Sequence, residues 1–169
     1  MIMRKPVAIL GSAVFFVVVP CAIAGLVPWW ITRWQFRDPF LGTWVTQAVG
    51  VTLIVAGLPG LVDSIRRFAV EGFGTPAPVA PTQILVVTGF YRHVRNPMYL
   101  SVLAIILGQG LLFGDWRLVA YGAAFWTICH LFVIAYEEPT LHHAFSAEYE
   151  AYQRNVPRWL PRLTPWRKG

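Results

Sequence analysis

Four long apolar stretches without charged residues follow one another along the chain: 6–32, 39–62, 96–114 and 118–136. Each contains at least 19 residues, and a helix needs roughly 20 apolar residues to cross the hydrocarbon core of a bilayer. Inside lipid the backbone must satisfy its own hydrogen bonds, so these stretches are expected to be helices. The pattern predicts an all-α, polytopic membrane protein with about four transmembrane helices.

Breaks in the apolar pattern place the first, second and fourth helices at about residues 7–28, 41–62 and 116–136. Prolines are favoured at the first position of a helix, so the third helix is expected to begin near Pro97. Two groups of glycine and proline interrupt these helices. We expect one group to kink or thin the end of the second helix: Gly57, Pro59 and Gly60. The other group should allow close helix contact along the third helix: Gly108, Gly110 and Gly114.

A different pattern follows the fourth apolar stretch. Leu141, Phe145, Tyr149 and Tyr152 repeat at helical spacing, which predicts an amphipathic cytoplasmic helix over 138–154. The tail, 156–169, mixes prolines, tryptophans and basic residues, a composition that suits the lipid headgroup zone. We interpret the chain as a single domain. It consists of two N-terminal membrane helices (1–62), a cytoplasmic connecting segment (63–97), a membrane hairpin (98–136) and a cytoplasmic helix with its tail (137–169).

Charge gives this arrangement an orientation. Only 13% of the residues are charged, about half the usual share in soluble domains. Four spans place eleven Lys and Arg residues on the side of both termini and three, Arg33, Arg37 and Arg117, on the other. By the positive-inside rule both termini lie in the cytoplasm, and we expect a protein of a bacterial inner membrane. Topology and anionic lipid explain the net charge of +6 better than nucleic acid does.

Two features of the apolar stretches leave alternatives open. The first stretch, with Ala22, Ile23 and Ala24 near its end, also fits a cleaved signal peptide. Trp29 and Trp30, which follow it, fit a membrane helix with an aromatic anchor better. Cys21 and Cys129 lie inside predicted spans without ligand spacing, so we expect buried small apolar residues and no metal site.

Two polar clusters flank the third and fourth stretches. The first is 89–99, and the second is Glu137 with Glu138. The 37 residues between them carry two charges, Asp115 and Arg117, near the middle, which is typical of two membrane helices joined by a tight turn. A hairpin returns to the side it left, so both clusters are expected to meet at one membrane face.

The chemistry of the two clusters is complementary. Two carboxylates at a helix C-terminus are unfavourable with the helix dipole, and the cations of Arg92, His93 and Arg95 are misplaced at a helix start. A zwitterion would relieve both, and aromatic faces can hold an adenine ring or a sulfonium. S-adenosylmethionine has all these groups, although nucleotides and phospholipids fit parts of such a site. A solvated helix end and a positive-inside anchor also explain the clusters.

The segment 89–99, Gly-Phe-Tyr-Arg-His-Val-Arg-Asn-Pro-Met-Tyr, resembles the Gly-x-Tyr-x-x-x-Arg-His-Pro-x-Tyr motif of isoprenylcysteine carboxyl methyltransferases and related bacterial phospholipid methyltransferase-like membrane proteins. The second cluster is similar to their second motif, together with the amphipathic helix and the Val-Pro-Arg at 156–158. The resemblance covers about residues 80–165. It implies a helical membrane enzyme that binds S-adenosylmethionine at its cytoplasmic face and methylates a lipophilic acceptor.

The resemblance also implies the site residues. The pocket lining would be Gln83, Ile84, Leu85, Val86 and Tyr91; the closure at the start of the third helix would be Asn96, Pro97, Met98 and Tyr99; and the ammonium ligand would be Glu137 or Glu138. No residue stands out as a general base, and the candidates are His93 and Glu138.

This chain departs from the prenylcysteine enzymes at two places. Asn96 replaces the usual histidine, and Val133 with Ile134 occupies the region of an arginine that meets the substrate carboxylate. Two other functions stay open: an NADPH-dependent membrane reductase of the sterol-reductase type, and a non-catalytic lipid-binding membrane protein.

Overall fold

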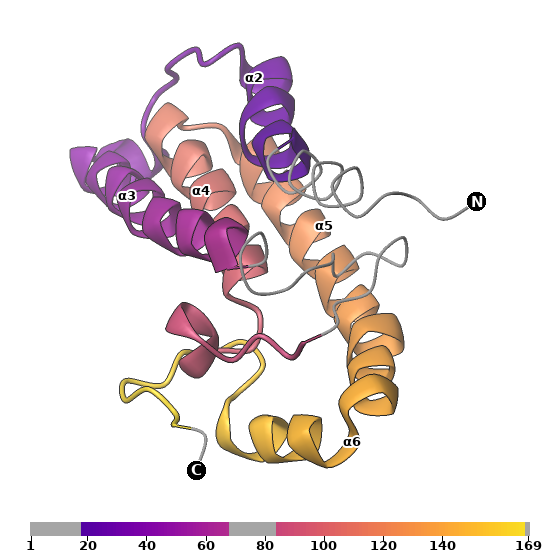
Figure 1. Ribbon diagram of the computed structural model, residues 1–169. Helices are drawn as coiled ribbons and strands as arrows, with labels where there is room; N and C mark the ends of the chain where they lie inside the picture. Colours follow the sequence, from indigo (N-terminus) through magenta and orange to yellow (C-terminus); the bar gives the residue numbers. More distant parts are fainter. Residues whose placement is uncertain (1–17, 68–83, 168–169) are drawn as a thin grey trace. The chain divides into compact units, whose positions relative to one another are not determined.

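The computed structural model describes residues 18–67 and 84–167, and every regular element in these two ranges is a helix (Figure 1). The prediction of an all-α chain is therefore confirmed for the described part. In chain order the elements are the π-helix η1 (Ala22–Leu26), α2 (Val27–Thr32), the 3₁₀-helix η2 (Phe40–Gly42), α3 (Trp44–Arg67), the 3₁₀-helix η4 (Gly89–Arg92), α4 (Pro97–Phe113), α5 (Trp116–Phe132), the π-helix η5 (Val133–Glu137) and α6 (Glu138–Asn155).

The apolar helices coincide with the four predicted stretches. Trp44–Arg67 and the continuous helical run Trp116–Asn155 are long and apolar enough to cross a membrane, and Val18–Thr32 and Pro97–Phe113 are shorter apolar helices. Proline stands at the first position of α4, as predicted. Residues 7–17 of the first predicted helix lie outside the described residues.

The ends of the first two predicted helices differ from the predictions. The first helix continues past residue 28 to Thr32. The helix predicted to end at 62 continues to Arg67, where the Arg67 guanidinium pairs with the Asp63 carboxylate one turn earlier at 2.9 Å and stabilises the further turn. Pro59 lies inside this helix without ending it.

The helix predicted to end at 136 does not end there. The chain passes from α5 through the π turn of η5 into α6, where the N–H of Glu138 bonds the Val133 carbonyl. Pro139 follows and has no N–H to give to a regular α-helix, and the wider π turn accommodates such a change of register. The predicted helix over 138–154 is broken at Ser146, whose φ of 40° is left-handed.

The described residues form two compact units. Unit 1 contains 62–67, 84–97 and 131–167, and unit 2 contains 18–61 and 98–130. In unit 2, α3 and α4 approach so closely that a Cβ on Gly108 would lie 2.7 Å from the Gly50 carbonyl oxygen, and a Cβ on Gly57 would lie 2.9 Å from the Ser101 carbonyl oxygen. The predicted close contact at Gly108 is confirmed.

Polar side chains add specific ties within unit 2. The buried Gln109 amide donates to the Ala24 carbonyl at 2.7 Å, and the Tyr121 hydroxyl donates to the Ile23 carbonyl at 3.1 Å. Both carbonyls belong to the π-helix η1, so partners on α4 and α5 satisfy backbone groups there. At the turn between α4 and α5, the fully buried Asp115 carboxylate pairs with Arg117 at 2.6 Å and with Arg37 at 3.3 Å.

The two cysteines differ in environment. Cys129 is buried as predicted, whereas Cys21 is exposed, which corrects the prediction that both are buried. The outward direction of Cys21 on its helix is a matter of helical register that composition does not reveal.

Candidate functional site

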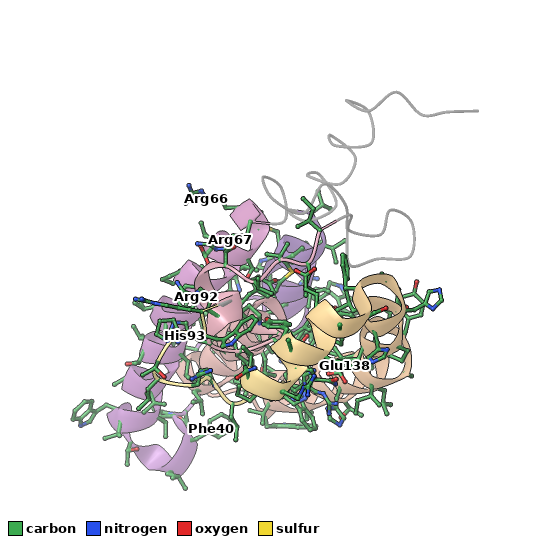
Figure 2. All side chains as sticks on the ribbon, turned by 60° about the horizontal axis from the view of Figure 1, so that its bottom comes forward. Phe40, Arg66, Arg67, Arg92, His93 and Glu138 are labelled. Carbon is green, nitrogen blue, oxygen red and sulfur yellow. The ribbon has the colours of Figure 1, made fainter. Side chains whose placement is uncertain are left out.

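The two polar clusters meet in unit 1, as the hairpin pattern predicted. Arg95, from the first cluster, pairs with the Glu138 carboxylate at 3.0 Å and donates to the Tyr149 hydroxyl at 3.3 Å. Arg158, from the tail, binds the same carboxylate through two hydrogen bonds of 2.7 Å. Figure 2 shows Glu138 on α6 and Arg92 and His93 on the segment around η4.

The charges of the two clusters are neutralised differently from the sequence-based expectation. Glu137 and Glu138 do not lie at a helix C-terminus, since the helical run continues through them from α5 into α6, and the unfavourable charge of a helix end is absent there. The cations that neutralise Glu138 are the chain's own Arg95 and Arg158. The anion that we expected near Arg95 is likewise Glu138.

An aromatic and aliphatic core supports this ion network. Its buried members are Leu85, Tyr149, Tyr152 and Val156, and the partly buried residues packed against them are Val87, Leu141, Phe145 and Trp166. The predicted stripe of the amphipathic helix is therefore confirmed as one packed face. The Tyr152 hydroxyl donates to the Tyr91 carbonyl at 2.7 Å, which joins α6 to η4.

The tail docks along the first cluster through backbone groups. The Arg95 N–H bonds the Pro157 carbonyl, the Arg162 N–H bonds the His93 carbonyl, and the Trp166 N–H bonds the Arg92 carbonyl, each at 2.9 Å. The Asn96 amide adds a bond to the Arg158 carbonyl at 3.2 Å. The tail thus orders residues 92–96, while its Leu163 remains 98% exposed.

The imidazole of His93 has a defined tautomer. Its Nδ1 lies 2.8 Å from the Arg162 carbonyl oxygen, and because a carbonyl only accepts, Nδ1 carries the hydrogen. In the neutral ring Nε2 is then the acceptor. His93 therefore retains one nitrogen that can take a proton.

Three tyrosines near the site stay neutral phenols at physiological pH. Burial raises the pKa of Tyr91 well above its ordinary value, and the negative charge of Glu137 raises it further. Burial and then Glu138 raise the pKa of Tyr149 to about 12, and burial raises that of Tyr152 more strongly. A tyrosinate base is thereby disfavoured, and the hydroxyls act as hydrogen-bonding groups.

One buried polar atom in this network has no hydrogen-bond partner within residues 18–67 and 84–167: Nε of Arg95. The Arg95 side chain is only 9% exposed. A buried guanidinium N–H that bonds nothing is costly and needs an explanation. An acceptor oxygen from a bound molecule would satisfy it.

The predicted site residues fall into distinct environments. Leu85, Val86, Tyr91 and Asn96 are buried in unit 1, and Ile84 is exposed. Pro97 is also buried and belongs to unit 1, whereas Met98 and Tyr99, the next residues of α4, belong to unit 2. Gln83 lies outside the described residues.

Sequence reasoning missed two groups of residues. Arg158 was assigned to the second motif and to a headgroup-binding tail, but its ion pair with Glu138 was not predicted. Asp63 and Ser64 were placed at the start of a connecting segment, although Asp63 accepts a bond from the Phe90 N–H at 3.2 Å. The one available signal was an acid at an otherwise basic end of an apolar helix.

Residues 45–148, more than half of the chain, match the family described as phospholipid methyltransferase (PEMT). The chain belongs to the phospholipid methyltransferase family. The match runs from the start of α3 into α6, so it includes both polar clusters. Comparisons with curated proteins and with solved structures gave no match.

The phospholipid methyltransferase family is a family of methyltransferases, which indicates an enzyme associated with membranes and lipids. The apolar helices of the described residues agree with this. The resemblance drawn from the two motifs is confirmed at the level of the family. Within it, the residues of unit 1 that join the two motifs are the candidate site.

Proposed function

We propose that this protein transfers a methyl group from S-adenosylmethionine to a lipophilic acceptor at the membrane. The observation that carries the proposal is the Arg95 side chain, which links the two clusters through Glu138 and keeps a buried Nε–H without a partner in the described residues. The methionine part of the donor ends in a carboxylate, and a guanidinium N–H is a strong donor to carboxylates. The residues present therefore fit the donor.

Glu138 has the role of holding Arg95 in this proposal. Its carboxylate already accepts two hydrogen bonds from Arg158 and forms an ion pair with Arg95, so it is poorly suited to bind an ammonium as well. Arg158, from the tail, holds the Glu138 carboxylate in place through two hydrogen bonds. Glu138 is thus a positioning residue for Arg95.

Glu137 is the better ligand for the ammonium of the donor. Its negative charge lies near enough to Tyr91, Tyr149 and Tyr152 to raise the pKa of each. A cation bound beside those rings gains from both the carboxylate and the aromatic faces. Of the two predicted carboxylates, we assign the ammonium to Glu137.

When bound, the donor supplies a methyl group activated on a positive sulfur, which an O, N or S atom of the acceptor takes as the carbon–sulfur bonding pair returns to sulfur. The protein's part is then largely positioning and exclusion of water. His93 Nε2 is the candidate for taking a proton from the acceptor, because Nδ1 is engaged with Arg162.

The acceptor is proposed to be phospholipid-like in preference to a prenylcysteine. The family description names phospholipid. At the region where the prenylcysteine enzymes have an arginine, Val133 is buried and Ile134 is exposed, and neither can pair with a carboxylate. The acceptor would enter from the bilayer and the donor from the cytoplasm, with both termini on the cytoplasmic side.

The test is transfer of a labelled methyl group. Purified protein in detergent is incubated with methyl-labelled S-adenosylmethionine and total bacterial lipid, and the lipid fraction is then counted. Label in lipid that Glu137→Gln abolishes, and that Glu150→Gln leaves intact, supports the proposal. Glu150 is a matched control because it is an exposed acid on the following helix, α6, where it pairs with His142 and Arg154. Absence of label with folded protein contradicts the proposal.

A further inference from the structure

Asp63, near the end of α3, contacts both α3 and η4 within unit 1. Its carboxylate accepts from Arg67 Nε at 2.9 and 3.0 Å and from the backbone N–H of Phe90, in η4, at 3.2 Å. The two residues that flank Tyr91 in sequence, Phe90 and Arg92, both belong to η4. Asp63 therefore fixes, from the end of α3, the backbone that carries Tyr91.

Ser64, the next residue of α3, acts on the Tyr91 side chain itself. Ser64 is completely buried, and its hydroxyl is hydrogen-bonded to the Tyr91 hydroxyl. Asp63 and Ser64, which are adjacent on α3, thus hold η4 through two groups: the backbone of Phe90 and the phenol of Tyr91.

The start of η4 is shaped to fit this contact. Gly89 has a φ of +51°, and a Cβ at that position would overlap the guanidinium of Arg67. Only glycine lets the chain turn there while Arg67 lies against it. Figure 2 shows Arg67 near the end of α3 and Arg92 on η4.

On its other side, Tyr91 is tied to the candidate site. Its carbonyl accepts from Tyr152, and residues 92–95 continue from η4 to the Arg95 that pairs with Glu138. A shift of η4 would therefore move Tyr91 and the residues that lead to Arg95.

We propose that Asp63 and Ser64 are positioning residues for the donor site, holding Tyr91 and η4 in the arrangement that binds the methyl donor. The inference rests on the proposed function, since Tyr91 faces the donor only if the donor binds in unit 1. Neither residue touches the donor in this account, and both act through η4.

The test measures binding of S-adenosylhomocysteine by calorimetry, without turnover. Asp63→Asn and Ser64→Ala should each raise the Kd about tenfold, and Ser64→Ala combined with Tyr91→Phe should cost no more than either alone, because coupled partners are non-additive. Faster amide exchange at Phe90 in Asp63→Asn gives a readout independent of the ligand.

Asp115→Asn is the matched control, because it breaks a buried carboxylate–arginine contact in unit 2. It should lower the unfolding temperature and leave the Kd unchanged. If Asp63→Asn does not fold, Ser64→Ala alone decides. Wild-type protein that binds S-adenosylhomocysteine, with Kd unchanged in the variants, would overturn this inference and leave the proposed function standing. Wild-type protein that does not bind it would overturn the proposed function and this inference together.

Discussion

Replacement of Glu138 by Gln removes the charge at the centre of the ion network in unit 1. The Glu138 side chain is 12% exposed; it accepts two hydrogen bonds of 2.7 Å from Arg158 and forms an ion pair with Arg95 at 3.0 Å. Arg158 is 30% exposed and can turn to water, whereas Arg95 is 9% exposed and cannot. The variant therefore leaves one buried guanidinium without its counter-charge.

The expected loss of stability follows from these contacts. A hydrogen bond to a charged group contributes about 1.5–3 kcal/mol, and removal of one partner of a buried ion pair costs about 3–5 kcal/mol. Because one of the two arginines is partly solvated, we expect about 3 kcal/mol. In a protein of this size 1 kcal/mol lowers the unfolding temperature by about 2–4 °C, so the expected decrease is roughly 6–12 °C.

The assay is thermal unfolding of the detergent-purified protein, with and without S-adenosylhomocysteine. Glu138→Gln should melt at a lower temperature in both conditions. Glu137→Gln should gain much less from the ligand than the wild type does, because Glu137 is assigned to the ammonium. Glu150→Gln, whose carboxylate is 49% exposed, should behave like the wild type in both. If Glu138→Gln unfolds at the same temperature as Glu150→Gln, the reasoning about the buried network is refuted.

Three further predictions concern the packing and the polar ties. Gly108→Ala should lower the unfolding temperature, because the added Cβ would meet the facing helix at 2.7 Å, whereas Gly25→Ala has nothing within 4 Å of its Cβ and should be neutral or stabilising. Hydrogen bonds from Arg117 hold the pKa of Asp115 below its usual range, so its contribution is present above about pH 4 and is lost as the pH falls further. The melting difference between wild type and Asp115→Asn should thus be constant from pH 5 to 8 and shrink below about pH 4; a difference that grows in acid would contradict the assignment. Tyr152→Phe removes the bond to the Tyr91 carbonyl and should cost about 1–2 kcal/mol in chemical unfolding, and an unchanged midpoint would show that the bond contributes nothing.

The features that sequence could predict are those set by local composition. The charge-free stretches located the apolar helices because lipid demands both apolar side chains and internal backbone bonding. The spacing of Leu141, Phe145, Tyr149 and Tyr152 predicted a face that packs as one core. The two charges at the middle of the apolar hairpin predicted that the clusters at its ends would meet, and Arg95 and Glu138 do.

The features that sequence could not predict depend on partners distant in the chain. The extra turn of α3 is stabilised by Asp63, which bonds Arg67 and the backbone of Phe90, 27 positions later. The arginines that neutralise Glu138 come from residues 43 positions before it and 20 positions after it. The passage of the helix through Glu137 depends on a π turn, and the break at Ser146 on a left-handed backbone. Periodicity carries no signal for any of these.

The central claim, that unit 1 binds S-adenosylmethionine, is tested most directly by calorimetric titration of the detergent-purified protein with S-adenosylhomocysteine, with NADPH as a parallel ligand. The account predicts saturable binding of S-adenosylhomocysteine, weakened by Glu137→Gln and not by Glu150→Gln, and no binding of NADPH. Binding of NADPH alone, or of neither ligand by folded protein, would contradict it.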